Sequence, residues 1–351
     1  MRAKNQPIYT WNMNLTEAEY LQREFSLTLT KLSESIEKQI VKSKLFYIAT
    51  ADPIELTKIL ESCKAKSAVI FFFGNETYDI PQFNWLNQYS SKIQFAFIYN
   101  LPRKTSFIIP LRCFVGALAD GGLFLWKRER NIFRNFKNGI DLMRRTRTLV
   151  LDFPHSDFPQ GYSRRFVKEI EMASINLGKG SILAQAPFKI APKSRTISFV
   201  GQSGSWCREL AIKVLMKKNI GFTPRYTQGW SGANQGALTT YVDSLIQSKL
   251  ILNPPGNLTN KTHRYLESLI FNSLPVMPPS TLQDPHLWGV WSESSNQKFF
   301  SWKRQIKYAL NLSHKNRESI ILDALLREKK LVQAINSVLD KIQGSINVEM
   351  E

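Results

Sequence analysis

The chain has 351 residues, of which 43% are hydrophobic and 21% are charged, as in ordinary globular proteins. This composition excludes a globally disordered chain, a collagen-like fibre and a coiled coil, and the length predicts about two domains. The formal net charge of +19 predicts an anionic partner, such as a nucleotide, a phospholipid surface or a nucleic acid.

The cysteines and the hydrophobic segments indicate the compartment. Cys63, Cys113 and Cys207 are too far apart for a CxxC metal site and too few for a disulfide scaffold, which favours a reducing compartment. The basic first residues precede no apolar run, so no secretory signal is expected. No stretch approaches the ~18 apolar residues of a membrane-spanning helix. The expected location is therefore cytoplasmic, with peripheral attachment to an anionic membrane face left open.

The first half of the chain alternates helical and strand-like segments. Helical spacing of apolar residues predicts helices over residues 15–32, 32–40 and 53–62. Short apolar runs predict buried strands at 45–49, 68–73 and 93–99. Because short apolar strands separated by helices are typical of parallel sheets covered on both faces, this half is expected to be α/β.

A second alternation begins near residue 196, after a linker-like segment rich in Gly and Pro at 177–195. Helices are expected at 208–218, 241–248 and 262–272, and strands at 196–200, 249–252 and 275–277. A long charged helix is expected at 315–342. Two α/β units and a helical tail therefore predict three divisions of the chain, at 1–190, 191–325 and 326–351.

Basic residues are concentrated in one segment of the first half. Residues 101–150 contain eleven Lys or Arg and three Asp or Glu, with aromatic residues between them. Two interpretations remain open, a solvated face or contact with an anionic partner such as a phosphorylated acceptor, a membrane or a nucleic acid. On the second interpretation, four arginines are candidate contacts with an acceptor or membrane: Arg128, Arg130, Arg144 and Arg145.

The segment 248–276 has the most informative pattern, which is a strand, a Pro/Gly turn, a helix and a second strand. Gly256 in the turn allows the backbone to approach a ligand closely. Thr259, Asn260 or Thr262 can cap the helix. The N–H groups at the start of such a helix form an anion site suited to a diphosphate.

Two charged residues on this helix extend the predicted site. Arg264, in the first turn, adds positive charge for a phosphate, and Glu267 lies three residues further along on the same face. The two acceptor oxygens of Glu267 suit the neighbouring hydroxyls of a ribose. The alternative is a plain βαβ unit in which Arg264 and Glu267 form a surface ion pair.

The same segment resembles the donor domain of exostosin-type glycosyltransferases, within the GT-B superfamily. That family has a strand, a Pro-x-Gly loop, Ser/Thr-x-Arg-x-x-Glu-Ala-Leu and Gly-x-x-Pro-Val. Ser268 replaces the usual alanine of this pattern, and Ser273 lies where the family often has Cys or Gly. The residues that match are Pro254 or Pro255, Gly256, Thr262, Arg264, Glu267, Leu269, Pro275 and Val276.

A second match lies upstream, at residues 197–208. There the strand ends in Phe-x-Gly at Gly201, and Arg208 follows at the next expected helix, which resembles the start of the family's donor domain. The resemblance implies that Gly201 leaves a bare backbone near the donor phosphates and that Arg208 contacts the leaving diphosphate. With the helix residues, the expected donor-binding set is Gly201, Arg208, Gly256, Asn260, Thr262, Arg264 and Glu267.

The resemblance implies a fold and a reaction. The fold is GT-B, with two Rossmann-like domains facing a cleft, the first for the acceptor and the second for the nucleotide sugar. The reaction transfers a sugar from a nucleotide diphosphate, as co-substrate, to a hydroxyl of a glycan or lipid-linked acceptor, with inversion. Glu76 and Asp79 are the candidate catalytic bases because they follow the buried strand at 68–73, where sites form in α/β sheets.

No metal and no cofactor are expected. The sequence has no Asp-x-Asp motif, so arginines and helix N–H groups are expected to take up the charge of the leaving diphosphate. The alternative function is a nucleic-acid-binding protein that uses the basic segment 103–147. Nucleic acid is not an expected partner of the glycosyltransferase.

Overall fold

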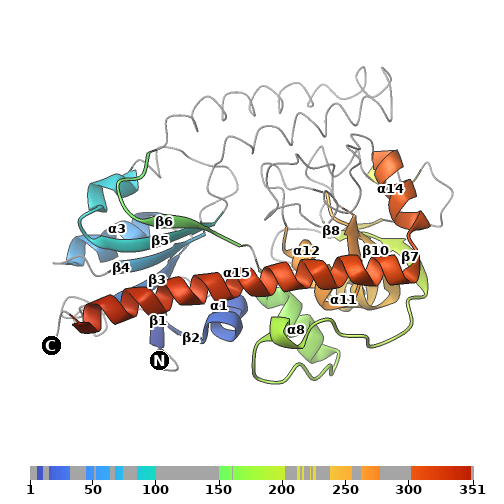
Figure 1. Cartoon of the computed structure of the whole chain (residues 1–351), viewed down its shortest axis with the longest axis horizontal. Coiled ribbons are helices and arrows are strands. Elements are labelled where there is room, and N and C mark those ends of the chain that lie inside the picture. The colour runs from blue at the N-terminus through green and yellow to red at the C-terminus, as the bar shows by residue number, and fades with distance from the viewer. Residues whose placement is uncertain are drawn as a thin grey trace, which may run out of the picture. The chain divides into compact units, whose positions relative to one another are not determined.

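The structure is a computed structural model that forms two compact units (Figure 1). Unit 1 comprises Met1–Arg103, Arg145–Arg164 and Lys330–Glu351, and unit 2 comprises Lys104–Arg144 and Arg165–Lys329. The structure describes residues 6–10, 16–31, 45–50, 53–63, 68–73, 85–99, 150–159, 161–201, 212–213, 216, 222, 224–226, 238–254, 262–276 and 302–348.

The described part of unit 1 contains a six-stranded sheet in the order β2-β1-β3-β4-β5-β6, with every neighbouring pair parallel. The burial of all five residues of β3 and of β4 confirms the expectation of buried strands. The strands are β1 (Gln6–Thr10), β2 (Leu27–Lys31), β3 (Phe46–Thr50), β4 (Ala68–Phe72), β5 (Ile93–Tyr99) and β6 (His155–Phe158).

Helix α3 (Pro53–Ser62) covers this sheet and closes its core. Its buried side chains Leu56, Ile59 and Leu60 pack in one cluster with residues of β3, β4 and β5. Helix α1 (Ala18–Phe25) and the short 3-10 helix η1 (Asn87–Tyr89) are the other helical segments described between residues 6 and 99. The parallel strands and the covering helix confirm the α/β class of this unit.

The helix predicted over residues 15–32 is wrong beyond Phe25. Ser26 adopts the left-handed conformation, with φ 53°, and ends α1. The next five residues, Leu27–Lys31, form β2 and pair along their whole length with β1. Their Leu-Thr-Leu-Thr alternation has the period of a strand, and sheet pairing prevails over the helical spacing. The helix expected at 32–40 lies outside the described residues.

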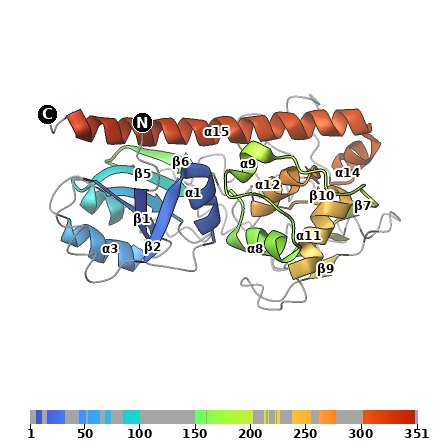
Figure 2. The same cartoon turned by 90° about the horizontal axis from the view of Figure 1, so that it is seen from below.

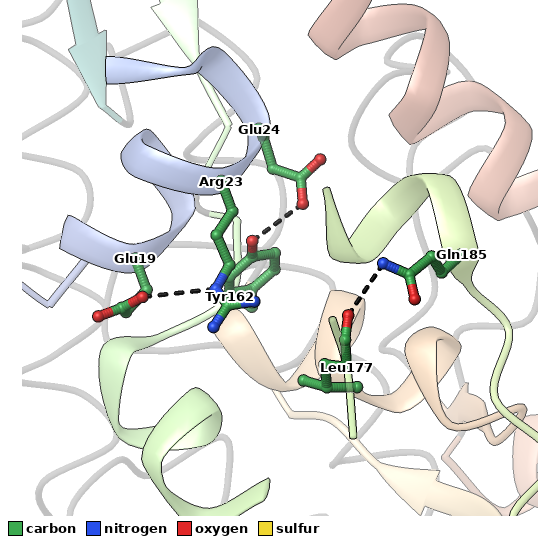
Figure 3. A network of polar contacts seen from close by, with 6 residues as sticks. All are labelled: Glu19, Arg23, Glu24, Tyr162, Leu177 and Gln185. Atoms are coloured by element: carbon green, nitrogen blue, oxygen red, sulfur yellow. Dashed lines mark hydrogen bonds and ion pairs between the residues drawn. The ribbon is translucent and has the colours of Figure 1, made fainter. Parts of the chain in front are cut away.

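An aromatic and polar cluster ties α1 to the segment after β6 within unit 1 (Figure 3). The hydroxyl of Tyr162 donates to Oε1 of Glu24 at 2.9 Å, and Arg23 pairs with Glu19 one turn away. Gly161, with φ +65°, packs directly against the ring of Tyr20, where a Cβ atom would overlap it. Glycine is therefore required here by both its backbone conformation and its space.

The described part of unit 2 contains a smaller parallel sheet in the order β11-β10-β7. Its strands are β7 (Arg195–Ser198), β10 (Ser248–Leu252) and β11 (Leu274–Val276). Helix α11 (Leu238–Gln247) lies beside β10 (Figure 2), and helix α12 (His263–Ile270) lies beside β11. This confirms the two strands and the helix predicted within residues 248–276, whereas the turn between β10 and α12 falls mostly on residues 255–261, outside the described part of the chain.

Two further strands of unit 2 lie outside its three-stranded sheet. The strand expected at 196–200 is divided, because β8 (Val200–Gly201) pairs with β9 (Arg225–Tyr226) and not with the three-stranded sheet. The helix expected at 208–218 falls mostly outside the described residues. The remaining helices are α8 (Arg164–Met172), α9 (Ile182–Gln185), α14 (Trp302–Asn311) and α15 (His314–Val348).

The linker-like segment 177–195 is part of unit 2 and contains α9, where Gln185 Nε2 donates to the carbonyl of Leu177 at 2.9 Å (Figure 3). The charged C-terminal helix is confirmed as α15, and its residues divide between the two units at Lys329. Within the portion of the chain that the structure describes, every helix is too short or too polar to cross a membrane.

Lys193 is a half-buried amine that joins the helix ends of unit 2. Its Nζ donates to the carbonyl oxygens of Leu245, at 2.9 Å, and Phe271, at 2.6 Å, and to Oγ of Ser273, at 2.9 Å. These acceptors lie at the C-terminal ends of α11 and α12, where a cation is favoured by the helix dipole. Burial lowers the pKa of Lys193 from 10.5 to about 8, so the amine is mostly charged at pH 7.

We expect Lys193→Met to lower the free energy of unfolding by about 2 kcal/mol, since hydrogen bonds to a charged donor contribute about 1.5–3 kcal/mol. Urea denaturation at pH 7 measures the effect. Lys179→Met, which changes an exposed lysine of the same unit, is the matched control and should leave stability within ~0.5 kcal/mol. Equal stability of the two variants would show that Lys193 does not hold these helix ends together.

Candidate functional site

The carboxyl ends of β7 and β10 bring the candidate site together. The two strands are parallel neighbours, so the residues that follow them, Phe199 and Asn253, leave the sheet at the same edge. Ligands of α/β sheets bind at this edge because the helices that follow the strands point their N-termini toward it. Helix α12 begins here, directly after Thr262.

Thr262 lies at the N-cap position of α12, but its side chain makes no capping hydrogen bond. Of the three expected cap residues, Thr262 thus occupies the cap position without a side-chain hydrogen bond, and Thr259 and Asn260 lie outside the described residues. The hydroxyl of Thr262 donates to Oδ1 of Asn253 at 2.5 Å, which ties the start of α12 to the end of β10. Asn253 is itself anchored to the sheet, because its backbone N–H donates to the carbonyl of Val276 at 2.9 Å.

Arg264 extends from the first turn of α12 to the segment that follows β7. Its Nη2 donates to the carbonyl of Val200 at 2.8 Å, and its guanidinium lies 4.9 Å from the centre of the Phe199 ring. The guanidinium fills the space at Gly201, where a Cβ atom would overlap it. A glycine at this position is thus needed for Arg264 to reach the strand end.

Two hydrogen-bond donors of Arg264 are not used in this arrangement. Its Nε and Nη1 are buried, and neither has a hydrogen-bond partner in the structure described above. An unsatisfied buried donor costs about 1–3 kcal/mol, and more when the group is charged. The guanidinium of Arg264 therefore keeps two buried N–H donors of the kind that bind anions.

Glu267 lies one turn further along α12 and is only 2% exposed. Its Oε2 accepts a hydrogen bond from the hydroxyl of Tyr241 on α11. This burial excludes the alternative of an ion pair on a solvated helix face. Burial raises the pKa of Tyr241 well above its ordinary value, with a further increase from the Glu267 carboxylate and an opposing effect of Arg264.

A second buried carboxyl group lies beside Glu267. Glu169 of α8 is 1% exposed, and its Oε1 accepts from Nε of Arg165 at 2.8 Å. The pKa of Glu169 is raised from 4.5 to about 8, mainly by burial; Arg165 and the backbone of Val242 lower it, and the charge of Glu267 adds to the increase. Glu169 is therefore mostly protonated near pH 7.

The structure brings three of the predicted donor-binding residues together: Gly201, Arg264 and, through the start of α12, Thr262. Glu267 lies on the same helix but in a buried position. The other predicted site residues lie outside the described residues: Arg208, Gly256, Asn260, Glu76, Asp79, Arg128, Arg130, Arg144 and Arg145. Among the residues that are described, no three His, Cys, Asp or Glu side chains gather in a way that could hold a metal ion.

Sequence analysis missed Asn253, Tyr241 and Glu169. A polar residue directly after the apolar Leu250–Leu252 run was a signal for Asn253, because it marks the strand's carboxyl end. Tyr241 and Glu169 had no such signal, since their roles depend on contacts between helices distant in sequence. No protein-family model and no curated protein matches the chain, so the resemblance to exostosin-type glycosyltransferases stays a prediction from its motifs.

Proposed function

We propose that the protein is a glycosyltransferase of the exostosin-like, GT-B type, and that unit 2 binds the nucleotide diphosphate of its sugar donor. The observation that carries the proposal is the buried guanidinium of Arg264, which has two unused donors beside the start of α12. Positive charge and helix N–H groups at the carboxyl edge of a parallel sheet are the usual recognition elements for a diphosphate. The order of motifs around this site is the second support.

In the proposed reaction, the diphosphate is the leaving group, and its growing negative charge is stabilised by groups already in position. Arg264 is held by Val200 and Phe199, so it needs no rearrangement to receive that charge. The acceptor is a hydroxyl of a glycan or glycolipid, which a carboxylate deprotonates; Glu76 and Asp79 remain the proposed bases. Metal independence, inversion and an acceptor site in the first half of the chain belong to the same proposal.

Glu267 is the proposed ligand of the donor ribose. Its carboxylate is fixed by Tyr241, and it lies three residues after Arg264, one turn further along α12. We expect Glu267→Gln to weaken nucleotide binding at least tenfold, equivalent to ~1.4 kcal/mol. Calorimetry with the best-binding nucleotide measures the change.

Tyr241→Phe is the matched control for this prediction. It removes the internal hydrogen bond of Glu267 and keeps the carboxylate. A ribose ligand predicts a larger loss of affinity in Glu267→Gln than in Tyr241→Phe. Wild-type affinity in both variants, together with similar losses of stability, would assign Glu267 to the packing of α11 against α12 and remove it from the site.

The function as a whole is tested by a thermal-shift panel of nucleotide diphosphates and nucleotide sugars. A ligand that binds only the folded state stabilises it by about 2.7 kcal/mol at a hundred times its Kd. We expect nucleotides of one particular base to raise the melting temperature, both as the nucleoside diphosphate and as the nucleotide sugar. No shift with any member of the panel, together with tight binding of single-stranded nucleic acid, would overturn the proposal in favour of the nucleic-acid-binding alternative.

A further inference from the structure

The end of β10 holds a second buried donor that the motif analysis did not assign. Asn253 is 0% exposed, and both its backbone N–H and its Oδ1 are hydrogen-bonded, to Val276 and Thr262 respectively. Its Nδ2 is also buried and has no hydrogen-bond partner within the structure as described. The side chain is thus half satisfied at the edge of the sheet where the candidate site lies.

The hydrogen bond from Thr262 fixes which half of the amide is satisfied. A hydroxyl that donates to the amide must meet the carbonyl oxygen, so the NH2 group is the part left over. An unsatisfied buried donor costs about 1–3 kcal/mol. The preceding strand residues Leu250, Ile251 and Leu252 are all apolar, and a leucine of similar size at 253 would avoid that cost. The amide therefore has a use beyond packing.

The amide group of Asn253 lies in the same small region as the guanidinium of Arg264. Asn253 is linked through Thr262 to the start of α12, and Arg264 is the second residue of that helix. Both unused groups are hydrogen-bond donors, Nδ2 of Asn253 and the Nε and Nη1 of Arg264. Two donors of this kind beside a helix N-terminus match a ligand that presents several acceptor oxygens.

We propose that Asn253 is a ligand-binding residue of unit 2, whose Nδ2 donates a hydrogen bond to an oxygen of the bound nucleotide diphosphate. The inference rests on the proposed function and adds to it a neutral recognition group, oriented by Thr262. Arg264 supplies charge, whereas Asn253 supplies a directional donor. A carboxylate at the same position would repel the ligand.

Asn253→Asp tests this role with little structural change. The aspartate keeps an oxygen to accept from Thr262, so the link between β10 and α12 is preserved, but it replaces the donor by a second acceptor and adds a negative charge. We expect affinity for the best binder among UDP, GDP, ADP and CDP to fall at least thirtyfold, as measured by calorimetry. Asn253→Ser, which is neutral and small, is the second variant, with an expected loss of about fivefold, and it keeps the test valid if the buried charge prevents folding.

Three results separate the inference from the proposed function. Weak binding by both Asn253 variants, with an unfolding transition like that of the wild type for at least one, supports the inference. Wild-type affinity in folded Asn253 variants, while Arg264→Met loses binding, overturns the role of Asn253 and leaves the proposed function in place. Absence of binding by the wild-type protein to all four nucleotides overturns both.

Discussion

Replacing Arg264 by methionine is expected to weaken nucleotide-diphosphate binding by about a hundredfold. Methionine keeps much of the apolar length that lies over Phe199 but removes every donor of the guanidinium. Two charge-assisted hydrogen bonds to phosphate oxygens contribute about 1.5–3 kcal/mol each, and a hundredfold change in Kd corresponds to about 2.7 kcal/mol. Calorimetry with the nucleotide that stabilises the wild type most is the measurement.

The same substitution should not greatly destabilise unit 2. It removes one hydrogen bond to Val200, but it also removes the cost of two buried donors without partners. Arg264→Lys is expected to recover part of the affinity, because lysine keeps the charge but not the planar fork of donors.

Lys249→Met is the matched control, since Lys249 is exposed and lies on β10 in the same βαβ unit. Loss of affinity in Lys249→Met comparable to that in Arg264→Met would mean that net charge, and not the position of Arg264, governs binding. Undiminished affinity in Arg264→Met would remove the arginine from the site and with it the main support for the proposed function.

The regular elements of unit 2 were predictable because each has a local signal. The apolar run before Asn253 and the turn residues after it specify β10 and the start of the next segment, whatever the rest of the chain does. The division of the strand near residue 199 was not predictable in this way. It depends on the pairing of Val200 and Gly201 with Arg225 and Tyr226, which are far away in sequence.

In unit 1, the failure of the predicted helix at Phe25 has a similar cause. Residues 27–31 form a strand because β1 provides a parallel partner, and the sequence around residues 6–10 gave no apolar run that would reveal it. A strand at the edge of a sheet is specified largely by its neighbour, so its signal in the sequence is weak.

The residues of the candidate site also differ in whether a local sequence signal marks them. Arg264 and Gly201 were identifiable because both belong to short motifs with fixed spacing. That Arg264 occupies the space which a Cβ atom at position 201 would fill was not visible from either motif. The burial of Glu267 could not be predicted either. A charged residue at helical spacing is expected to face solvent, whereas Tyr241 and Glu169 cover Glu267.

The buried carboxyl of Glu169 makes stability depend on pH. Its pKa is about 8 in the folded protein and about 4.5 when unfolded, so between these values the folded state holds a proton that the unfolded state has lost. The free energy of unfolding then falls as pH rises, by up to ~1.4 kcal/mol per pH unit for a single group. The contribution of Glu169 to the free energy of unfolding is therefore fully present below pH 4.5 and is lost as pH rises through 8.

Glu169→Gln is therefore expected to flatten the loss of stability between pH 5 and pH 8, which in the wild type should amount to about 3 kcal/mol from this group. Glutamine is neutral throughout and keeps an oxygen to accept from Arg165, so the variant should match the wild type at pH 5 and exceed its stability at pH 8. Urea denaturation at pH 5, 6, 7 and 8 measures the difference. Glu171→Gln, at an exposed position of the same helix, is the control and should follow the wild-type curve. Parallel curves for the wild type and Glu169→Gln would show that Glu169 is ionised in the folded protein.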